Sequence, residues 1–105
     1  MNLMPEKFHY FAIIRPSRSD FITNPSEDDT KIMRDHFQYL KKLLEDKHLY
    51  LAGPTLIETD PFGVLIFETK SEEEARELLI NDPSVKAGIQ NIEDLRPIRI
   101  SLSRC

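Results

Sequence analysis

Residues 8–14 have the sequence FHYFAII, and this stretch decides the fold. It is rich in aromatic and β-branched residues and ends at Arg15-Pro16, a pattern that predicts a β-strand. Successive side chains of a strand point to opposite faces of the sheet. Both faces of this strand are apolar, so the sheet that contains it needs a cover on each side. One face carries Phe8, Tyr10, Ala12 and Ile14, and the other carries Phe11 and Ile13.

A long amphipathic helix is expected after this strand, from about residue 27 to residue 46. Ser26 is a candidate N-cap, and Asp29 three positions later makes an acidic variant of the capping box. His36 falls on the apolar stripe of this helix, where a histidine is poor core material because its ring nitrogens need hydrogen-bond partners. The stripe itself consists of Ile32, Met33, Phe37, Leu40, Leu43 and Leu44.

The rest of the chain predicts three more strands and a second helix. Pro97 lies in the expected last strand, and because it has no N–H it requires an edge strand or a bulge. The expected elements are strands at His48–Ala52, at Gly63–Glu68 and within Ile89–Leu102, a helix that begins with a capping box at Ser71–Glu74 and ends at Asn81-Asp82-Pro83, and a short turn of helix or irregular segment at Ser84–Gly88.

The element order is therefore β-α-β-β-α-β, which indicates an α+β, ferredoxin-like domain with an antiparallel sheet, spanning residues 1–105. Two helices cover only one face of a four-stranded sheet. The other apolar face favours a second copy of the chain, packed sheet to sheet as a homodimer. The alternative is a monomer whose second face is covered by its own loops.

Composition excludes several classes of protein. The chain has 14 Lys and Arg against 18 Asp and Glu, a net charge of −4, which argues against binding to nucleic acid or to an anionic membrane surface. No apolar run approaches the length of a membrane span, and the first residues lack the features of a signal peptide. The single cysteine, Cys105, cannot form an internal disulfide and is expected to be inert. A cytoplasmic protein is expected.

Five elements of the sequence carry a resemblance to a known family. They are HxxYLxxL at 36–43, LxLAGP at 49–54, SxEEA at 71–75, DPxVxxG at 82–88 and Pro97. In this order and spacing they resemble the YciI-related (YCII) family, over roughly residues 8 to 100. The resemblance implies a dimeric α/β barrel of ferredoxin-like subunits. Proteins with similar folds include muconolactone isomerases, a chloromuconolactone dehalogenase and cofactor-free monooxygenases.

The same resemblance implies an active site built on His36 and Asp82. A carboxylate at Nδ1 would fix the tautomer of His36 and leave Nε2 as the base. Each residue also has a purely structural interpretation. His36 could bond a backbone carbonyl, and Asp82 before Pro83 is a typical N-cap of a helix.

Further residues are candidates for binding a substrate. Arg15 ends the first strand and suits a carboxylate, although a solvated strand end is the alternative. Tyr39 lies one turn from His36 and presents its hydroxyl to the cavity or simply packs. Phe21, with Ile22, lies in a loop that looks longer than in the shortest family members and is expected to cap the pocket. Gly53-Pro54 is expected near the pocket, and Gly88 is expected at a positive φ or a close approach.

The chain departs from the family at Lys47, where many members end the first helix with a glycine. The helix then ends without a left-handed glycine, or Lys47 adopts a costly conformation. No metal site is expected, because His9, His36 and His48 lack ligand spacing and there is no cysteine pair. The sequence also has neither a glycine-rich phosphate loop nor a Gly-x-Ser-x-Gly motif.

Three functions remain open at this point. The first is a small enzyme without a cofactor that uses His36 and Asp82 for acid–base chemistry on a small organic molecule, as an isomerase, a lyase or a dehalogenase. The second is a module on the same barrel that binds a small metabolite without converting it. The third is a cofactor-free monooxygenase.

Overall fold

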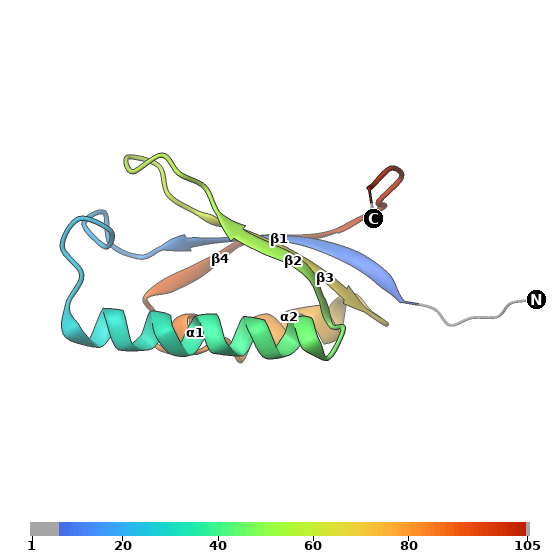
Figure 1. Cartoon of the computed structure of the whole chain (residues 1–105), viewed down its shortest axis with the longest axis horizontal. Coiled ribbons are helices and arrows are strands. Elements are labelled where there is room, and N and C mark those ends of the chain that lie inside the picture. Colours follow the sequence, from blue (N-terminus) through green and yellow to red (C-terminus); the bar gives the residue numbers. More distant parts are fainter. Residues whose placement is uncertain (1–6, 105) are drawn as a thin grey trace, which may run out of the picture.

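A computed structural model describes residues 7–104; Cys105 lies outside the described residues. Within these residues, four strands and three helices follow one another in the expected order, and the third helix is the expected short helical turn (Figure 1). No helix in this described part of the chain is both long and apolar enough to cross a membrane. The elements are β1 (Phe8–Pro16), α1 (Glu27–Glu45), β2 (Leu49–Pro54), β3 (Gly63–Thr69), α2 (Glu72–Ile80), α3 (Pro83–Lys86) and β4 (Gln90–Ile98).

The strands form one antiparallel sheet in the order β2-β3-β1-β4. The helices lie on one face of this sheet, and no helix formed by residues 7–104 covers the other face (Figure 1). Pro97 lies opposite Tyr10 on the edge strand β4, where a missing N–H breaks no inner ladder. The protein therefore has the α+β, ferredoxin-like fold that the element order predicts.

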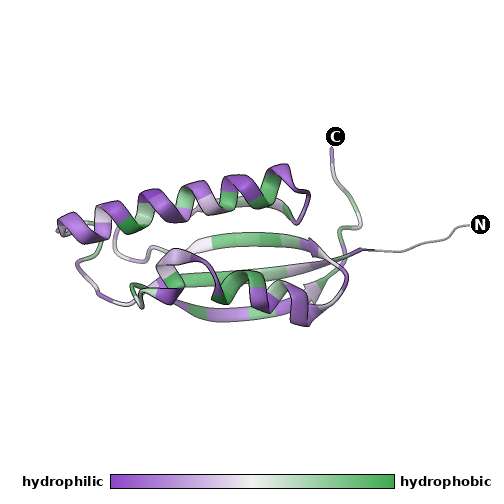
Figure 2. Ribbon diagram, turned by 90° about the horizontal axis from the view of Figure 1, so that it is seen from below, coloured by the Kyte–Doolittle hydropathy of each residue, from purple (hydrophilic) through white to green (hydrophobic). Residues whose placement is uncertain are grey.

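The core lies between the sheet and the helices. The alternation predicted for the first strand is confirmed, since Tyr10, Ala12 and Ile14 are buried under the helices. Figure 2 shows the hydrophobic middle of the strands, in green, facing the more hydrophilic helices. The outer face of the sheet is also apolar at its centre. The residues on it are Phe11, Ile13, Val64 and Ile66, each partly exposed.

The ends of two predicted elements differ from the structure. The last strand ends at Ile98, so Leu102 is not part of it and is exposed. At the start of α2, Ser71 caps the N–H of Glu74, but the Glu74 carboxylate accepts from the N–H of Lys70 instead of Ser71. The second half of the predicted capping box is therefore shifted by one residue.

Part of the apolar stripe of α1 does not enter the core. Leu43 is buried, whereas Phe37 is 62% exposed and Leu44 is 48% exposed. The spacing of apolar residues along a helix predicts which side chains share one face, but it does not predict what packs against that face. Here α1 crosses an opening beside the sheet, and these two side chains border it.

Of the two endings expected for α1, the structure shows the one in which Lys47 adopts a left-handed backbone conformation. Lys47 has φ = 67°, a left-handed backbone that usually selects glycine. Its N–H donates to the carbonyl of Leu44, and the N–H of His48 donates to the carbonyl of Leu43. These bonds satisfy the last carbonyls of α1 at a conformational cost of about 1–2 kcal/mol.

Candidate functional site

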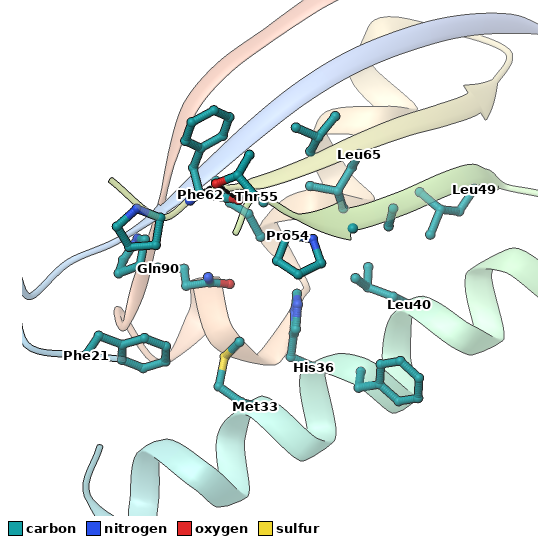
Figure 3. A pocket seen from close by; sticks show the side chains of 18 of the residues that line it. Phe21, Met33, His36, Leu40, Leu49, Pro54, Thr55, Phe62, Leu65 and Gln90 are labelled. Atoms are coloured by element: carbon teal, nitrogen blue, oxygen red, sulfur yellow. Dashed lines mark hydrogen bonds between the residues drawn. The ribbon is translucent and has the colours of Figure 1, made fainter. Parts of the chain in front are cut away.

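A cavity of about 430 Å³ lies between α1 and the sheet (Figure 3). Its walls are almost entirely apolar, and α1 forms one wall while β2, β3 and the end of β1 form the other. Two connections close it, one before α1 and one between β2 and β3. Its apolar lining includes Ile14, Phe21, Ile22, Met33, Phe37, Leu40, Leu44, Leu49, Pro61, Phe62 and Leu65.

The loop before α1 is held by a buried carboxylate. Asp29 accepts from the N–H of Ser26 at 2.9 Å, and Ser26 Oγ accepts from the N–H of Asp29 at 3.0 Å, which completes the predicted capping box. Arg18 donates to Asp29 Oδ2 at 2.6 Å and lies over the ring of Phe21 at 5.8 Å. These contacts fix the start of α1 and the aromatic side chain that closes this end of the cavity.

His36 and Asp82 are in direct contact. His36 Nδ1 lies 2.7 Å from Asp82 Oδ2 and 2.9 Å from Oδ1. The Asp82 side chain is fully buried, and the His36 side chain is 13% exposed on the cavity wall. Nδ1–H therefore donates to the carboxylate, which leaves Nε2 unprotonated in the neutral ring. A nitrogen in this state is able to accept a proton from a molecule in the cavity.

Asp82 also caps α3. Its Oδ1 accepts from the N–H of Ser84 at 2.8 Å, and Pro83 occupies the first helical position. The structural and the functional interpretation of this residue are thus compatible, because one carboxylate makes both sets of contacts. The cap holds the carboxylate still, and a fixed carboxylate fixes the imidazole ring.

Two polar residues that the sequence interpretation did not select extend this pair. Ser84 Oγ is buried and lies 2.9 Å from Asp82 Oδ1, 3.3 Å from His36 Nδ1 and 2.8 Å from Gln90 Oε1. Gln90 begins β4, is buried, and lines the cavity (Figure 3). Ser84 lies inside the DPxVxxG element, so the motif could have indicated that it lies near the site. Gln90 belongs to no motif, so nothing in the sequence indicated that it lines the cavity.

Phe21, Gly53 and Pro54 line the cavity. Gly88 has the expected positive φ of 77° but does not line the cavity. Its carbonyl accepts from the hydroxyl of Ser17 at 2.6 Å. Gly88 therefore shapes the turn between α3 and β4, and no ligand contact is assigned to it.

Arg15 does not face the cavity. It follows the buried Ile14, so its side chain lies on the outer face of the sheet. There it pairs with Glu93 and, at 2.5 Å, with Asp60. Its guanidinium also lies 4.8 Å from the centre of the Phe62 ring. The expected role as an anchor for an anionic substrate is replaced by a structural one, in which Arg15 holds the connection between β2 and β3 against the cavity.

Tyr39 also does not line the cavity. Its hydroxyl donates to the carbonyl of Leu78 at 2.6 Å and ties α1 to α2. Burial, together with the negative charge of Asp82, raises the pKa of Tyr39 to about 12. The phenol remains protonated at neutral pH and keeps this bond, so the packing alternative describes Tyr39.

The described residues contain no group of three or more histidine, cysteine or acidic side chains arranged to hold a metal ion. The polar groups on the cavity wall are His36, Lys41, Thr55 and Gln90. This set offers proton transfer and hydrogen bonding.

The model of the YCII-related domain matches residues 9–99. The chain belongs to the YCII-related family. Comparison with curated protein sequences gives no match.

A solved structure resembles this YCII-related chain along most of its length. It is 5-chloro-2-hydroxyhydroquinone dehydrochlorinase (TftG) from Burkholderia phenoliruptrix AC1100, in complex with 2,5-dihydroxybenzoquinone. The two chains are 25% identical with a TM-score of 0.58, and the likeness covers 86% of this chain and 91% of the dehydrochlorinase. The family and this neighbour together support a protein that handles a small molecule, either as an enzyme or as a binding module.

Proposed function

We propose that this protein is an enzyme that moves protons on a small oxygenated ring compound, with His36 as the general base and acid and Asp82 as its positioning residue. The observation that carries the proposal is the contact of 2.7 Å between His36 Nδ1 and the buried Asp82 carboxylate, made at the wall of an apolar cavity. General acid–base catalysis by a positioned side chain typically contributes about 10²- to 10⁴-fold to a rate.

The surroundings of His36 suit this role. Asp82 stabilises the imidazolium that forms when Nε2 takes a proton. The cavity wall is mostly apolar, so water competes little for the ring nitrogen or for the bound molecule. Phe21 and Phe62 both line the cavity, and aromatic side chains suit a flat ring.

The likeness to a dehydrochlorinase favours an elimination over the other reaction types. On a hydroxylated, halogenated ring, His36 would take a proton from one hydroxyl and return it to the carbon that carries the halogen, which gives the keto tautomer. It would then take the proton of a second hydroxyl. The electron pair of that O–H bond forms a carbonyl, and halide leaves. The sum is the loss of one hydrogen halide, with no external oxidant.

The experiment measures halide release from 5-chloro-2-hydroxyhydroquinone and binding of 2,5-dihydroxybenzoquinone by the wild type, by His36→Ala and by a control, His48→Gln. His48 is not part of the cavity wall. We expect the wild type and the control to release halide, and His36→Ala to lose about 100-fold or more of the rate. Unchanged turnover in His36→Ala would contradict the mechanism. Binding without turnover in the wild type would favour the binding module.

The same proposal includes a homodimer formed through the outer face of the sheet. Phe11, Ile13, Val64 and Ile66 form an apolar centre there, which none of the three described helices covers. A second copy would bury this centre sheet to sheet. Sedimentation should give a dimer, and Phe11→Arg should give a monomer. A wild type that is monomeric at high concentration would refute the dimer and leave the chemistry of His36 untouched.

A further inference from the structure

The cavity beside α1 is much larger than a single ring compound needs (Figure 3). Its volume is about 430 Å³, whereas an apolar cavity of roughly 150 Å³ is already enough to hold benzene. Its wall follows α1 from Met33 to Leu44, and this length of helix corresponds to a rise of about 16 Å. A single ring in contact with His36 would therefore leave most of this apolar space unfilled. The dimensions fit a longer molecule, in which an apolar chain continues from the ring.

Large apolar side chains at the mouth of the cavity are open to solvent. Phe37 is 62% exposed, Leu44 is 48% exposed and Ile22 is 44% exposed, and all three line the cavity. Exposed apolar side chains that gather in one place mark binding surfaces, whereas single ones are ordinary. The apolar part of a longer ligand would cover these three side chains and remove them from water.

The charge of the cavity wall is opposite to that of the whole chain. The chain has a net charge of −4, yet among residues 7–104 no aspartate or glutamate lines the cavity, and Lys41 does. Lys41 is exposed as well as part of the wall. A lysine takes such a position when its aliphatic stem packs on apolar surface and its ammonium group stays in water. This arrangement favours a ligand that places an anionic group at the mouth.

Lys41 and His36 lie on opposite borders of the apolar stripe of α1. Their separation in the sequence places them about 140° apart around the helix axis and about 7.5 Å apart along it. The cavity-lining side chains between these two borders are Met33, Phe37, Leu40 and Leu44. A ligand that contacts both Lys41 and His36 therefore has two polar ends with an apolar part between them.

We propose that this cavity binds an elongated amphipathic carboxylate, whose carboxylate pairs with Lys41 at the mouth and whose apolar body lies along α1 with its far end at His36. Lys41 thus takes the role of anion anchor that the sequence pattern favoured for Arg15. The inference deepens the proposed function and rests on it for the use of this cavity as the ligand site. An ion pair at an exposed lysine is weak, so apolar burial supplies most of the affinity and Lys41 supplies the selectivity for charge.

Phenylalkanoates of different length test the size of the ligand. Phenylacetate and 6-phenylhexanoate share the ring and the carboxylate and differ only in the length of the methylene chain between them. We expect the wild type to bind 6-phenylhexanoate at least about tenfold more tightly than phenylacetate, measured by titration calorimetry. Phe37→Ser shortens an exposed side chain of the mouth, so the fold should be kept. This variant should bind 6-phenylhexanoate about threefold or more weakly and phenylacetate within about twofold of the wild type.

An uncharged analogue tests the role of Lys41. We expect the wild type to bind 6-phenylhexanoate about threefold or more tightly than 6-phenylhexanamide, which has the same chain without the charge. Lys41→Gln should bring the two affinities to within about 1.5-fold of each other and leave the affinity for the amide unchanged. Lys42→Gln is the matched control, because it removes the same charge from the next residue, which is 73% exposed and does not line the cavity. This control should keep the preference for the carboxylate.

The outcomes separate this inference from the proposed function. Equal binding of the acid and the amide by the wild type, or a preference that persists in Lys41→Gln, would overturn the role of Lys41. Phenylacetate bound as tightly as 6-phenylhexanoate, or no binding of either acid, would overturn the elongated ligand. Halide release that depends on His36 would in each case still support the acid–base mechanism. Selective binding of the longer acid by a protein whose turnover does not depend on His36 would support this inference and refute the mechanism.

Discussion

Asp29 and Asp82 are two buried carboxylates built on the same plan. Each lies at the start of a helix and accepts a backbone N–H, from Ser26 for Asp29 and from Ser84 for Asp82. Each also accepts from a side chain that can carry positive charge, Arg18 for Asp29 at 2.6 Å and His36 for Asp82 at 2.7 Å.

The partner makes the difference between the two sites. Arg18 is always charged, cannot give up its proton, and lies at the surface. It holds the pKa of Asp29 down at about 2. The imidazole of His36 binds Asp82 through Nδ1, which leaves its Nε2 for a molecule in the cavity. The same cap thus fixes a loop in one place and supports the proposed chemistry in the other.

Asp82→Asn should separate the cap from the chemistry and have the largest effect. Asparagine is a good N-cap, so α3 should keep its start and the melting temperature should change little. An amide does not stabilise an imidazolium, so halide release should fall by about 100-fold or more. The measurement is steady-state halide release beside a thermal melt. Turnover near that of the wild type would show that Asp82 is only a cap.

Asp82→Ala should destabilise the protein as well. It removes the cap and leaves the buried hydroxyl of Ser84 and the Nδ1–H of His36 without their carboxylate. The free energy of unfolding should fall by roughly 2–4 kcal/mol, which denaturant titration measures. A loss as small as that of Asp82→Asn would mean that the carboxylate network adds little to stability.

Arg18→Gln should change acid stability but not turnover. The pKa of Asp29 is lowered in the folded state, so its contribution to stability is complete above the ordinary value of about 3.8 and is lost as the pH falls toward about 2. Without Arg18 the pKa of Asp29 rises, and this loss becomes smaller. Unfolding titrations between pH 2 and pH 6 measure the difference. An acid profile that matches the wild type would contradict the role assigned to Arg18.

The C-terminal end of α1 involves no side-chain carboxylate, so a substitution there serves as a comparison for the Asp29 and Asp82 sites. Lys47 ends α1 at a positive φ, which glycine adopts without the steric cost. Lys47→Gly should therefore raise the free energy of unfolding by about 1 kcal/mol, with no effect on ligand binding. Destabilisation would mean that the lysine side chain makes a contribution larger than its backbone strain.

Local chemistry in the sequence predicts much of this molecule. The capping box at Ser26 and the Asp82-Pro83 pair fixed the starts of α1 and α3, and alternation in residues 8–14 indicated two apolar faces. The contact between His36 and Asp82 followed from the family resemblance, since nothing local brings together residues 46 positions apart.

The sequence could not predict what the tertiary fold places opposite a side chain. Arg15 suited a substrate anion, yet Glu93 and Asp60 from distant segments take its hydrogen bonds. Phe37 has the spacing of a core residue, but α1 crosses an open cavity at that point. Gln90 belongs to no motif, because its buried contact with Ser84 joins two different elements, β4 and α3.

The hydrogen bond from Arg15 to Asp60 in the connection between β2 and β3 has a consequence for proteolysis of the chain. Leu56 and Ile57 in this connection are exposed and suit a protease that prefers large apolar residues. After a cut between them, strand pairing and the bond from Arg15 to Asp60 would still hold both pieces. The nicked protein should therefore migrate as two fragments under denaturing conditions and as one species in the native state.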